Sequence, residues 1–281
     1  MKKKNLIPWA SGAALAGGYL FAIAPRVHKR PAPMKKVYYA HRGLHDNDSE
    51  APENTMAAFQ KAVDAGYGME LDVQLTKDGQ VVVIHDMDLK RLCQVDAEVD
   101  SFTYEQLQQF SICASSQRIP LFRDVLRLVD GRVPLIVELK YKKGSRICEK
   151  AQEILQEYRG EYCIESFYPG VLLWYKKHYP EICRGQLSMN YQRDDGRKNA
   201  VYYIMRFLLT NFITRPDFIA YDCRAMRALS KNLCRRLFGC PSVAWTIRSQ
   251  EQLDSCRGYY DYFIFEGFLP QDREKEGKDH A

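Results

Sequence analysis

Short apolar runs alternate with amphipathic segments over most of the chain, beginning near residue 37. Repetition of apolar residues every three to four positions is typical of helices that bury one face, and glycine often follows their last residue. Such helical patterns lie at residues 56–66, 120–131, 145–160 and 249–258. Strand-like runs lie at residues 36–43, 68–75, 134–140, 162–167, 183–189, 217–222, 242–247 and 260–267. This alternation predicts an α/β fold, a closed TIM (β/α)8 barrel, which typically has about 250 residues.

An open, doubly wound sheet is the alternative arrangement of alternating strands and helices. Its dinucleotide-binding form carries the pattern GxGxxG directly after a strand. That pattern follows none of the strand-like runs in this sequence. The closed barrel is therefore the favoured prediction.

The regular alternation is interrupted between residues 75 and 134. The sequence TKDGQ at 76–80 predicts a tight turn, and the apolar run at 81–86 predicts a strand that returns from it. The following residues, about 87–118, fit no strand–helix pair and are interpreted as a small insertion after the second barrel strand. Insertions after barrel strands lie on the face that binds substrate.

The first 30 residues have a different pattern from the rest of the chain. Lysines at 2–4 precede an uncharged run from Leu6 to Pro25, and basic residues follow it. A run of about 20 uncharged residues can cross a bilayer, so we expect a transmembrane anchor helix within residues 1–30. A cleaved signal peptide is the competing interpretation, but Pro25 follows the most suitable cleavage site, at residues 22–24.

Charge and cysteine content bear on location and partners. Basic residues are more numerous after the apolar run, including the linker at 31–36, which favours a cytoplasmic main domain on a membrane anchor. The nine cysteines contain no CxxC pair, and buried, reduced thiols agree with a reducing compartment.

The net charge is only +6 and no basic stripe is interleaved with aromatic residues, so no nucleic-acid partner is expected. A charged tail at 271–281 follows the predicted barrel, which spans residues 37–270.

Carboxylates lie at alternate positions of two predicted strands. Glu70 and Asp72 share one face of the second strand, and Glu138 and Lys140 share one face of the third. Several carboxylates inside a barrel are costly unless a cation lies between them. Mg²⁺ and Ca²⁺ prefer oxygen ligands, so one divalent cation, either Mg²⁺ or Ca²⁺, is the expected cofactor.

Two histidines end apolar strands, His41 after the first strand and His85 after the returning strand. Histidine is suited to proton transfer near neutral pH. With Arg42 and Lys140 nearby, two histidines and a metal form a site for an anionic substrate such as a phosphodiester.

Several motifs resemble those of the glycerophosphodiester phosphodiesterase family. They are AHRG, PENT, ELDVQLTKDGQVVVIHD and VELK, followed in order by TYEQL, IPLFRDVL, ESF and AWTI. The resemblance implies metal-dependent hydrolysis of glycerophosphodiesters to an alcohol and glycerol 3-phosphate, or of lysophospholipids to lysophosphatidic acid. It implies these roles by position: His41 and His85 as the acid/base pair, Glu70, Asp72 and Glu138 as metal ligands, Arg42 and Lys140 as phosphate contacts, Glu53 as a partner of Arg42, and Trp245 as a pocket residue.

Two other functions remain open at this stage. One is a catalytically silent barrel that binds lipid head groups at a membrane, and the other is a lyase that releases a cyclic phosphate from the same substrates. The sequence also departs from the family at the end of the last strand. The family usually has a Thr-Asp-aromatic-Pro pattern there, whereas this chain has Phe265 and Glu266 followed by Gly-Phe-Leu-Pro at 267–270. The apolar segment at 201–213 predicts either a barrel helix that buries one face or a helix that contacts lipid beside the pocket.

Overall fold

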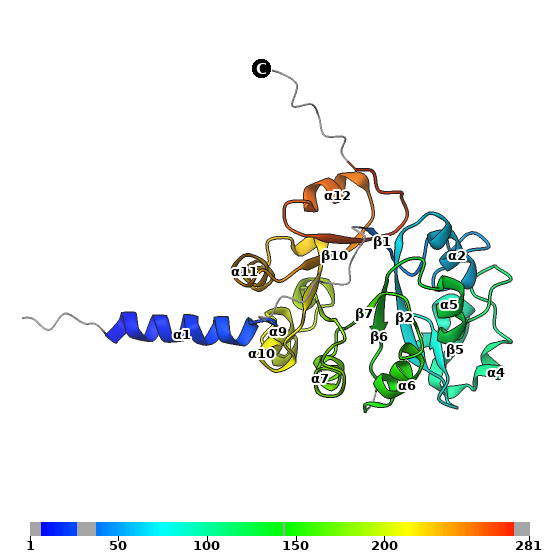
Figure 1. Cartoon of the computed structure of the whole chain (residues 1–281), viewed down its shortest axis with the longest axis horizontal. Coiled ribbons are helices and arrows are strands. Elements are labelled where there is room, and N and C mark those ends of the chain that lie inside the picture. The colour runs from blue at the N-terminus through cyan, green and yellow to red at the C-terminus, as the bar shows by residue number, and fades with distance from the viewer. Residues whose placement is uncertain (1–6, 27–37, 143, 273–281) are drawn as a thin grey trace, which may run out of the picture.

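The computed structural model describes residues 7–26, 38–142 and 144–272. Within these residues, eight parallel strands close into a barrel, because β1 pairs with β2 on one side and with β11 on the other. The predicted TIM barrel is confirmed (Figure 1). The barrel strands, in spatial order, are β1 (Tyr38–Ala40), β2 (Gly68–Leu75), β6 (Leu135–Leu139), β7 (Tyr162–Ser166), β8 (Arg184–Ser188), β9 (Phe218–Asp222), β10 (Ser242–Ile247) and β11 (Tyr262–Phe265).

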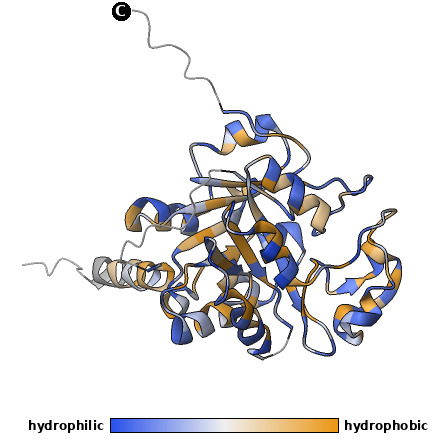
Figure 2. Ribbon diagram, turned by 45° about the vertical axis from the view of Figure 1, so that its right-hand side comes forward, coloured by the Kyte–Doolittle hydropathy of each residue, from blue (hydrophilic) through white to orange (hydrophobic). Residues whose placement is uncertain are grey.

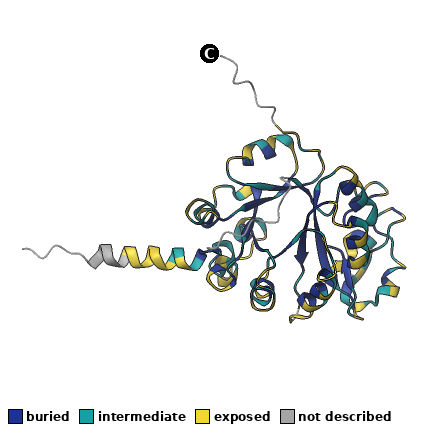
Figure 3. Cartoon of the chain, in the orientation of Figure 1, coloured by how far each residue is buried: buried dark blue, intermediate teal, exposed yellow. Residues whose placement is uncertain are grey.

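Helices connect the strands and cover the outside of the barrel (Figure 1). They carry apolar and hydrophilic residues together (Figure 2), and the strands they cover are buried (Figure 3). α2 begins where the Thr55 side chain accepts a hydrogen bond from the Ala58 N–H at 3.3 Å, an N-cap interaction. The connecting helices are α2 (Met56–Asp64), α5 (Phe122–Val129), α6 (Arg146–Leu155), α7 (Pro169–His178), α8 (Tyr191–Asp194), α9 (Ala200–Arg206), α10 (Asn211–Thr214), η2 (Cys223–Ala225), α11 (Leu229–Phe238) and α12 (Gln250–Cys256).

The inside of the barrel is filled with side chains from alternate strand positions. Ile136, Leu187 and Phe218 belong to one buried apolar cluster there. Gly185 provides room for this packing, because a Cβ atom at that position would lie 2.1 Å from the Phe218 ring. Polar side chains follow the apolar layer along the strands, and they form the site described below.

The segment after β2 turns back as β3 (Val81–Val83), which pairs antiparallel with β2, as the turn sequence predicted. Beyond it, the inserted region predicted at 87–118 holds short elements with their own apolar cluster, which includes Leu92 and Leu107. These elements are β4 (Asp88–Leu89), α3 (Lys90–Cys93), β5 (Val95–Glu98), η1 (Val99–Ser101) and α4 (Tyr104–Leu107). The insertion is therefore a small packed unit rather than an open loop.

The predicted transmembrane anchor within residues 1–30 is not supported. α1 (Ile7–Ile23) has 17 residues, which corresponds to a length of about 25 Å, less than the roughly 30 Å of a bilayer core. Among the described residues, none of the helices has both the length and the apolar character needed to span a membrane. α1 extends away from the barrel (Figure 1), while its last turn is attached to it through hydrogen bonds from Asn211 to the Ile23 carbonyl and from Arg215 to the Ala24 carbonyl, both at 2.9 Å. The linker predicted at 31–36 and residues 273–281 of the predicted tail lie outside the described residues.

The apolar segment at 201–213 forms two short helices instead of one. Leu208 separates α9 from α10, with a left-handed backbone at φ 57° and a buried side chain. α9 buries none of its residues. Asn211 and Thr214 of α10 are buried, so the first alternative, a barrel helix that buries one face, holds only for the second half of the segment, and the lipid contact stays a prediction.

Candidate active site

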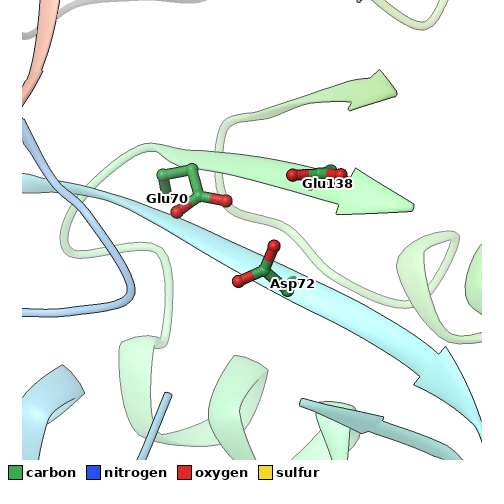
Figure 4. Close-up of side chains that lie close together, drawn as sticks. All are labelled: Glu70, Asp72 and Glu138. Atoms are coloured by element: carbon green, nitrogen blue, oxygen red, sulfur yellow. The ribbon is translucent and has the colours of Figure 1, made fainter. Parts of the chain in front are cut away.

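Three buried carboxylates meet inside the barrel (Figure 4). Glu70 and Asp72 are two residues apart on β2 and therefore point to the same side. Asp72 is in register with Glu138 of β6. One oxygen from each carboxylate lies within 4.8 Å of the others. The structure thus brings together the three residues that the sequence predicted as metal ligands.

Cationic side chains compensate only part of this negative charge. Lys140 Nζ lies 2.8 Å from Asp72 Oδ1 and 2.8 Å from Glu138 Oε1. Although burial opposes ionisation, Lys140 holds the pKa of Asp72 well below its usual value. Burial, together with the charges of Asp72 and Glu138, raises the pKa of Glu70 well above its usual value. Three buried carboxylates with incomplete compensation and oxygen donors alone fit a hard divalent cation.

His41 follows β1 at the barrel's seam. Its backbone N–H donates to the Phe265 carbonyl at 2.9 Å, which continues the β1–β11 pairing. Its ring Nδ1 contacts Glu266 Oε2, and Nε2 lies 3.9 Å from Glu70 Oε2. Burial and the neighbouring Arg42 lower the pKa of His41 to about 4. The ring is therefore neutral at pH 7, donates from Nδ1 to Glu266 and leaves Nε2 free to accept a proton.

Glu266, where the sequence departs from the family pattern, orients His41. The hydrogen bond from His41 lowers the pKa of this carboxylate to about 2, against the effect of burial. Its second oxygen lies 2.7 Å from Arg248 Nη2. The longer glutamate side chain thus reaches the imidazole, a contact that the sequence alone did not reveal.

His85 lies on the opposite side of the site, in a cavity of about 790 Å³ that is also lined by Glu138 and Lys140. Its Nδ1 is 2.7 Å from Asp86 Oδ1. A carboxylate can only accept, so Nδ1 donates and Nε2 is directed away from Asp86. Both predicted catalytic histidines are therefore held at Nδ1 by a carboxylate.

The two predicted residues Arg42 and Glu53 contact each other, with Arg42 Nη1 2.5 Å from Glu53 Oε1. The backbone N–H of Arg42 donates to Glu70 Oε2 at 3.2 Å, from a left-handed conformation with φ 54°. Asn54, which sequence reasoning missed, donates to Asp72 Oδ2 at 2.9 Å. The PENT motif therefore contacts both the guanidinium and one carboxylate of the predicted metal site.

Trp245 lies on β10, with its ring edge-on to Phe167 at a centroid distance of 5.4 Å. Phe167 lines the cavity that holds His85, and the same wall includes Tyr168 and Tyr191. Tyr168 stacks on Tyr141 at 3.6 Å. The site thus has a charged end at the carboxylates and an aromatic side wall.

Glu165 was also missed as a site residue. It lies on β7 in register with Glu138 and is buried. Among the described residues, its Oε2 has no hydrogen-bond partner. Burial and the charges of Glu138 and Asp72 raise its pKa well above the usual value. Its place in the ESF motif could have drawn attention to it, but its register with Glu138 could not be read from the sequence.

The site combines two histidines held at Nδ1, three clustered carboxylates and two partly exposed cations, Arg42 and Lys140, and such groups suit the hydrolysis of an anionic ester. The chain belongs to the glycerophosphoryl diester phosphodiesterase family, whose model matches residues 41–217. It is a phosphodiesterase of the phosphoric diester hydrolase class, as the motifs predicted.

Two relatives of similar sequence are named glycerophosphodiester phosphodiesterase, and a third is named lysophospholipase D. A glycerophosphodiester phosphodiesterase of Bacillus altitudinis is 36% identical over 170 residues, which cover 56% of this chain and 68% of that relative. One from Caldanaerobacter subterraneus is 36% identical over 167 residues, covering 55% of this chain and 67% of the relative. A rat protein named lysophospholipase D GDPD1 is 34% identical over 139 residues, covering 44% and 42%.

Solved structures show the same fold. An Oleispira antarctica phosphodiesterase, determined in complex with its product sn-glycerol-3-phosphate, superposes with a TM-score of 0.66 at 21% identity and covers 82% of this chain and 92% of that one. A glycerophosphodiester phosphodiesterase from Thermotoga maritima has a TM-score of 0.62 at 24% identity, covering 85% and 96%.

Proposed function

We propose that the protein is a metal-dependent hydrolase of glycerophosphodiesters that uses two histidines for proton transfer. The observation that carries this proposal is the group of three buried carboxylates, whose oxygens lie within 4.8 Å of one another. His41 approaches this group from β1, and His85 shares a cavity with Glu138.

Glu70, Asp72 and Glu138 would hold one Mg²⁺ or Ca²⁺ ion. When bound, the ion supplies positive charge that stabilises the phosphoryl oxygens as negative charge builds on them. Arg42 and Lys140 add fixed positive charge beside the same position, since both are only partly exposed and are paired with carboxylates of the site.

The histidines divide the proton transfers between them. His41 is neutral with a free Nε2, so it takes the proton of the attacking hydroxyl. His85, when it carries protons on both ring nitrogens, then gives the Nε2 proton to the leaving oxygen and keeps its Nδ1–H on Asp86. Glu266 and Asp86 stay deprotonated and keep each Nδ1–H in place.

The attacking hydroxyl belongs either to water or to the glycerol carbon next to the ester. Attack by water breaks the bond to the leaving alcohol and gives glycerol 3-phosphate directly. Attack by the glycerol hydroxyl gives a cyclic phosphate, which water opens in a second step. The lyase alternative corresponds to a reaction that stops before this second step.

The cavity favours a substrate with one apolar arm. Its lining includes the aromatic and apolar side chains of Phe167, Tyr191 and Met205, together with polar residues at 195, 197 and 199. An acyl chain would bury apolar surface against this wall. We therefore include lysophospholipids among the substrates, in agreement with the name of the rat relative.

Product analysis tests this proposal directly. The full chain, purified in mild detergent, is incubated with glycerophosphocholine or with lysophosphatidylcholine, with and without a chelator, and phosphorus NMR follows the products. We expect linear glycerol phosphate or lysophosphatidic acid, and complete loss of turnover with the chelator.

Each other outcome identifies a different function. A cyclic phosphate that accumulates without opening indicates the lyase. Absence of turnover for every diester, with or without added Mg²⁺ or Ca²⁺, contradicts the proposal and favours a catalytically silent head-group binder.

We also propose that an apolar surface beside the cavity meets an anionic lipid surface. This surface consists of exposed side chains on α9 and α10 with one from α1, and we call it the α9–α10 surface. Val201 belongs to it and also lines the cavity. Arg215 lies over the Phe21 ring at 5.2 Å, so a cation accompanies the apolar groups. The exposed members are Phe21, Val201, Tyr203, Ile204, Phe212 and Ile213.

Sedimentation with vesicles checks this surface. In the full chain, Tyr203→Ser with Phe212→Ser is expected to weaken binding to vesicles of phosphatidylcholine and phosphatidylglycerol by about tenfold or more, since burial of one large apolar side chain contributes about 1.5–3 kcal/mol. Leu269→Ser is the control, because Leu269 is 60% exposed but lies outside this surface. Unchanged binding of the double variant would refute the lipid contact.

A further inference from the structure

One arginine of the inserted segment reaches back to the barrel. Arg91 lies on α3, and its guanidinium makes contacts to two carboxylates. Nη1 and Nη2 lie 2.7 Å from the two oxygens of Glu53, and Nε lies 2.6 Å from Asp86 Oδ2. Arg91 therefore uses three N–H groups on acceptors that are 33 residues apart in the chain.

Both acceptors hold a predicted catalytic or phosphate-binding side chain with their other contacts. Asp86 Oδ1 accepts from His85 Nδ1 at 2.7 Å. Glu53 Oε1 accepts from Arg42 Nη1 at 2.5 Å. A single carboxylate thus links the Arg91 guanidinium to His85, and another links it to Arg42.

The insertion holds Arg91 in a fixed place. The next residue, Leu92, is buried in the insertion's apolar cluster, and its carbonyl accepts the Cys113 N–H at 2.7 Å. Gln94 ends α3 in a left-handed conformation with φ 58°. The backbone that carries Arg91 is therefore fastened directly after the residue.

The geometry explains why an arginine is needed. A planar guanidinium can bond both oxygens of one carboxylate and a third oxygen of another in fixed directions, whereas a lysine ammonium is a point charge without this fork. The Arg91 side chain is 45% exposed, whereas that of Glu53 is 4% exposed. Arg91 thus holds a buried carboxylate from the surface of the insertion.

We propose that Arg91 is a positioning residue, which orients His85 through Asp86 and Arg42 through Glu53 and so makes the packed insertion part of the active-site framework. Arg91 does not touch the reacting atoms in this scheme. It keeps the Nδ1–H of His85 on Asp86, so that Nε2 faces the substrate whether or not it carries a second proton. The expected fall in kcat rests on the proposed function, whereas the expected effect on the orientation of the His85 ring does not.

The test compares Arg91→Ala and Arg91→Lys in the full chain. Loss of a group that orients an active-site residue typically costs about 10- to 100-fold in activity. For Arg91→Ala we expect a fall in kcat of about this size, with a smaller change in KM. Arg91→Lys is expected to keep the charge but recover only part of the activity. Lys90→Ala is the matched control, because the neighbouring Lys90 makes only an exposed ion pair with Asp96 at 3.4 Å.

Nitrogen-15 NMR of labelled histidine gives a readout that does not depend on turnover. The His85 signals, assigned with His85→Gln, are expected to show the Nδ1-protonated form in the wild type and a mixture of the two neutral forms in Arg91→Ala. Wild-type kcat together with unchanged His85 signals in Arg91→Ala would overturn the proposal. If Arg91→Ala does not fold, the same two results in Arg91→Lys would overturn it. A wild type without any diesterase activity would contradict the proposed function, while the NMR comparison would still decide the role of Arg91.

Discussion

Replacement of His41 or His85 by alanine is expected to lower kcat for diester hydrolysis by about 100- to 10,000-fold, the usual contribution of general acid–base catalysis. Each ring is held at Nδ1 by a carboxylate, Glu266 for His41 and Asp86 for His85, so each presents Nε2 in a fixed direction. Neither ring belongs to the apolar clusters that fill and surround the barrel. Both variants should therefore fold, with circular dichroism and a thermal midpoint like those of the wild type.

His178→Ala is the control for this pair. That histidine lies on α7, where its ring stacks on Trp174 at 4.7 Å, and no described contact links it to the site. It should leave kcat unchanged. A wild-type kcat in His41→Ala or His85→Ala would remove that residue from the mechanism.

Replacement of Glu70 by glutamine is expected to abolish metal binding and most of the activity. A bound ion contributes several kcal/mol to the stabilisation of charge in the transition state, which corresponds to about 100- to 1,000-fold or more in rate. Glu70 has a pKa far above its usual value because it is buried beside Asp72 and Glu138. A carboxyl whose pKa is higher in the folded than in the unfolded chain destabilises the fold at neutral pH, so the glutamine variant should be at least as stable as the wild type without metal.

Thermal unfolding with Mg²⁺, with Ca²⁺ and with a chelator measures this effect. The wild type should melt at a higher temperature when the ion is present, since a ligand that binds only the folded state stabilises it. Glu70→Gln should lose this shift. Glu165→Gln is the matched control, because Glu165 is buried on a neighbouring strand but lies outside the group of three carboxylates. A metal-dependent shift that persists in Glu70→Gln would show that the ion binds elsewhere.

The barrel could be predicted because its strands are buried on both sides. Such strands form short apolar runs, and each run here ends in a polar or glycine-containing segment. The turn at Asp78-Gly79 likewise revealed the antiparallel β3. The segment at 201–213 was left open between a barrel helix and a helix that contacts lipid, because apolar content indicates burial only on average. In the structure a break at Leu208 divides the segment, and much of it is exposed.

The candidate site was predictable to the extent that its residues lie in continuous motifs. Glu70 and Asp72 are two residues apart, and strand geometry alone places them on one side. The contacts of Arg91 with Glu53 and of Glu266 with His41 were not predictable. The first two residues are 38 positions apart in the chain, and the second two are 225 positions apart. Such pairings depend on the register of the closed barrel and on how the insertion packs, which periodicity does not encode.

The contact between His41 and Glu266 ties the orientation of this ring to closure of the barrel. Glu266 directly follows β11, and β11 is the strand that pairs with β1, next to His41. The three candidate ligands lie instead on β2 and β6, which pair with each other. A change that loosens the β1–β11 seam is therefore expected to release the imidazole from its carboxylate while the acidic cluster keeps its geometry.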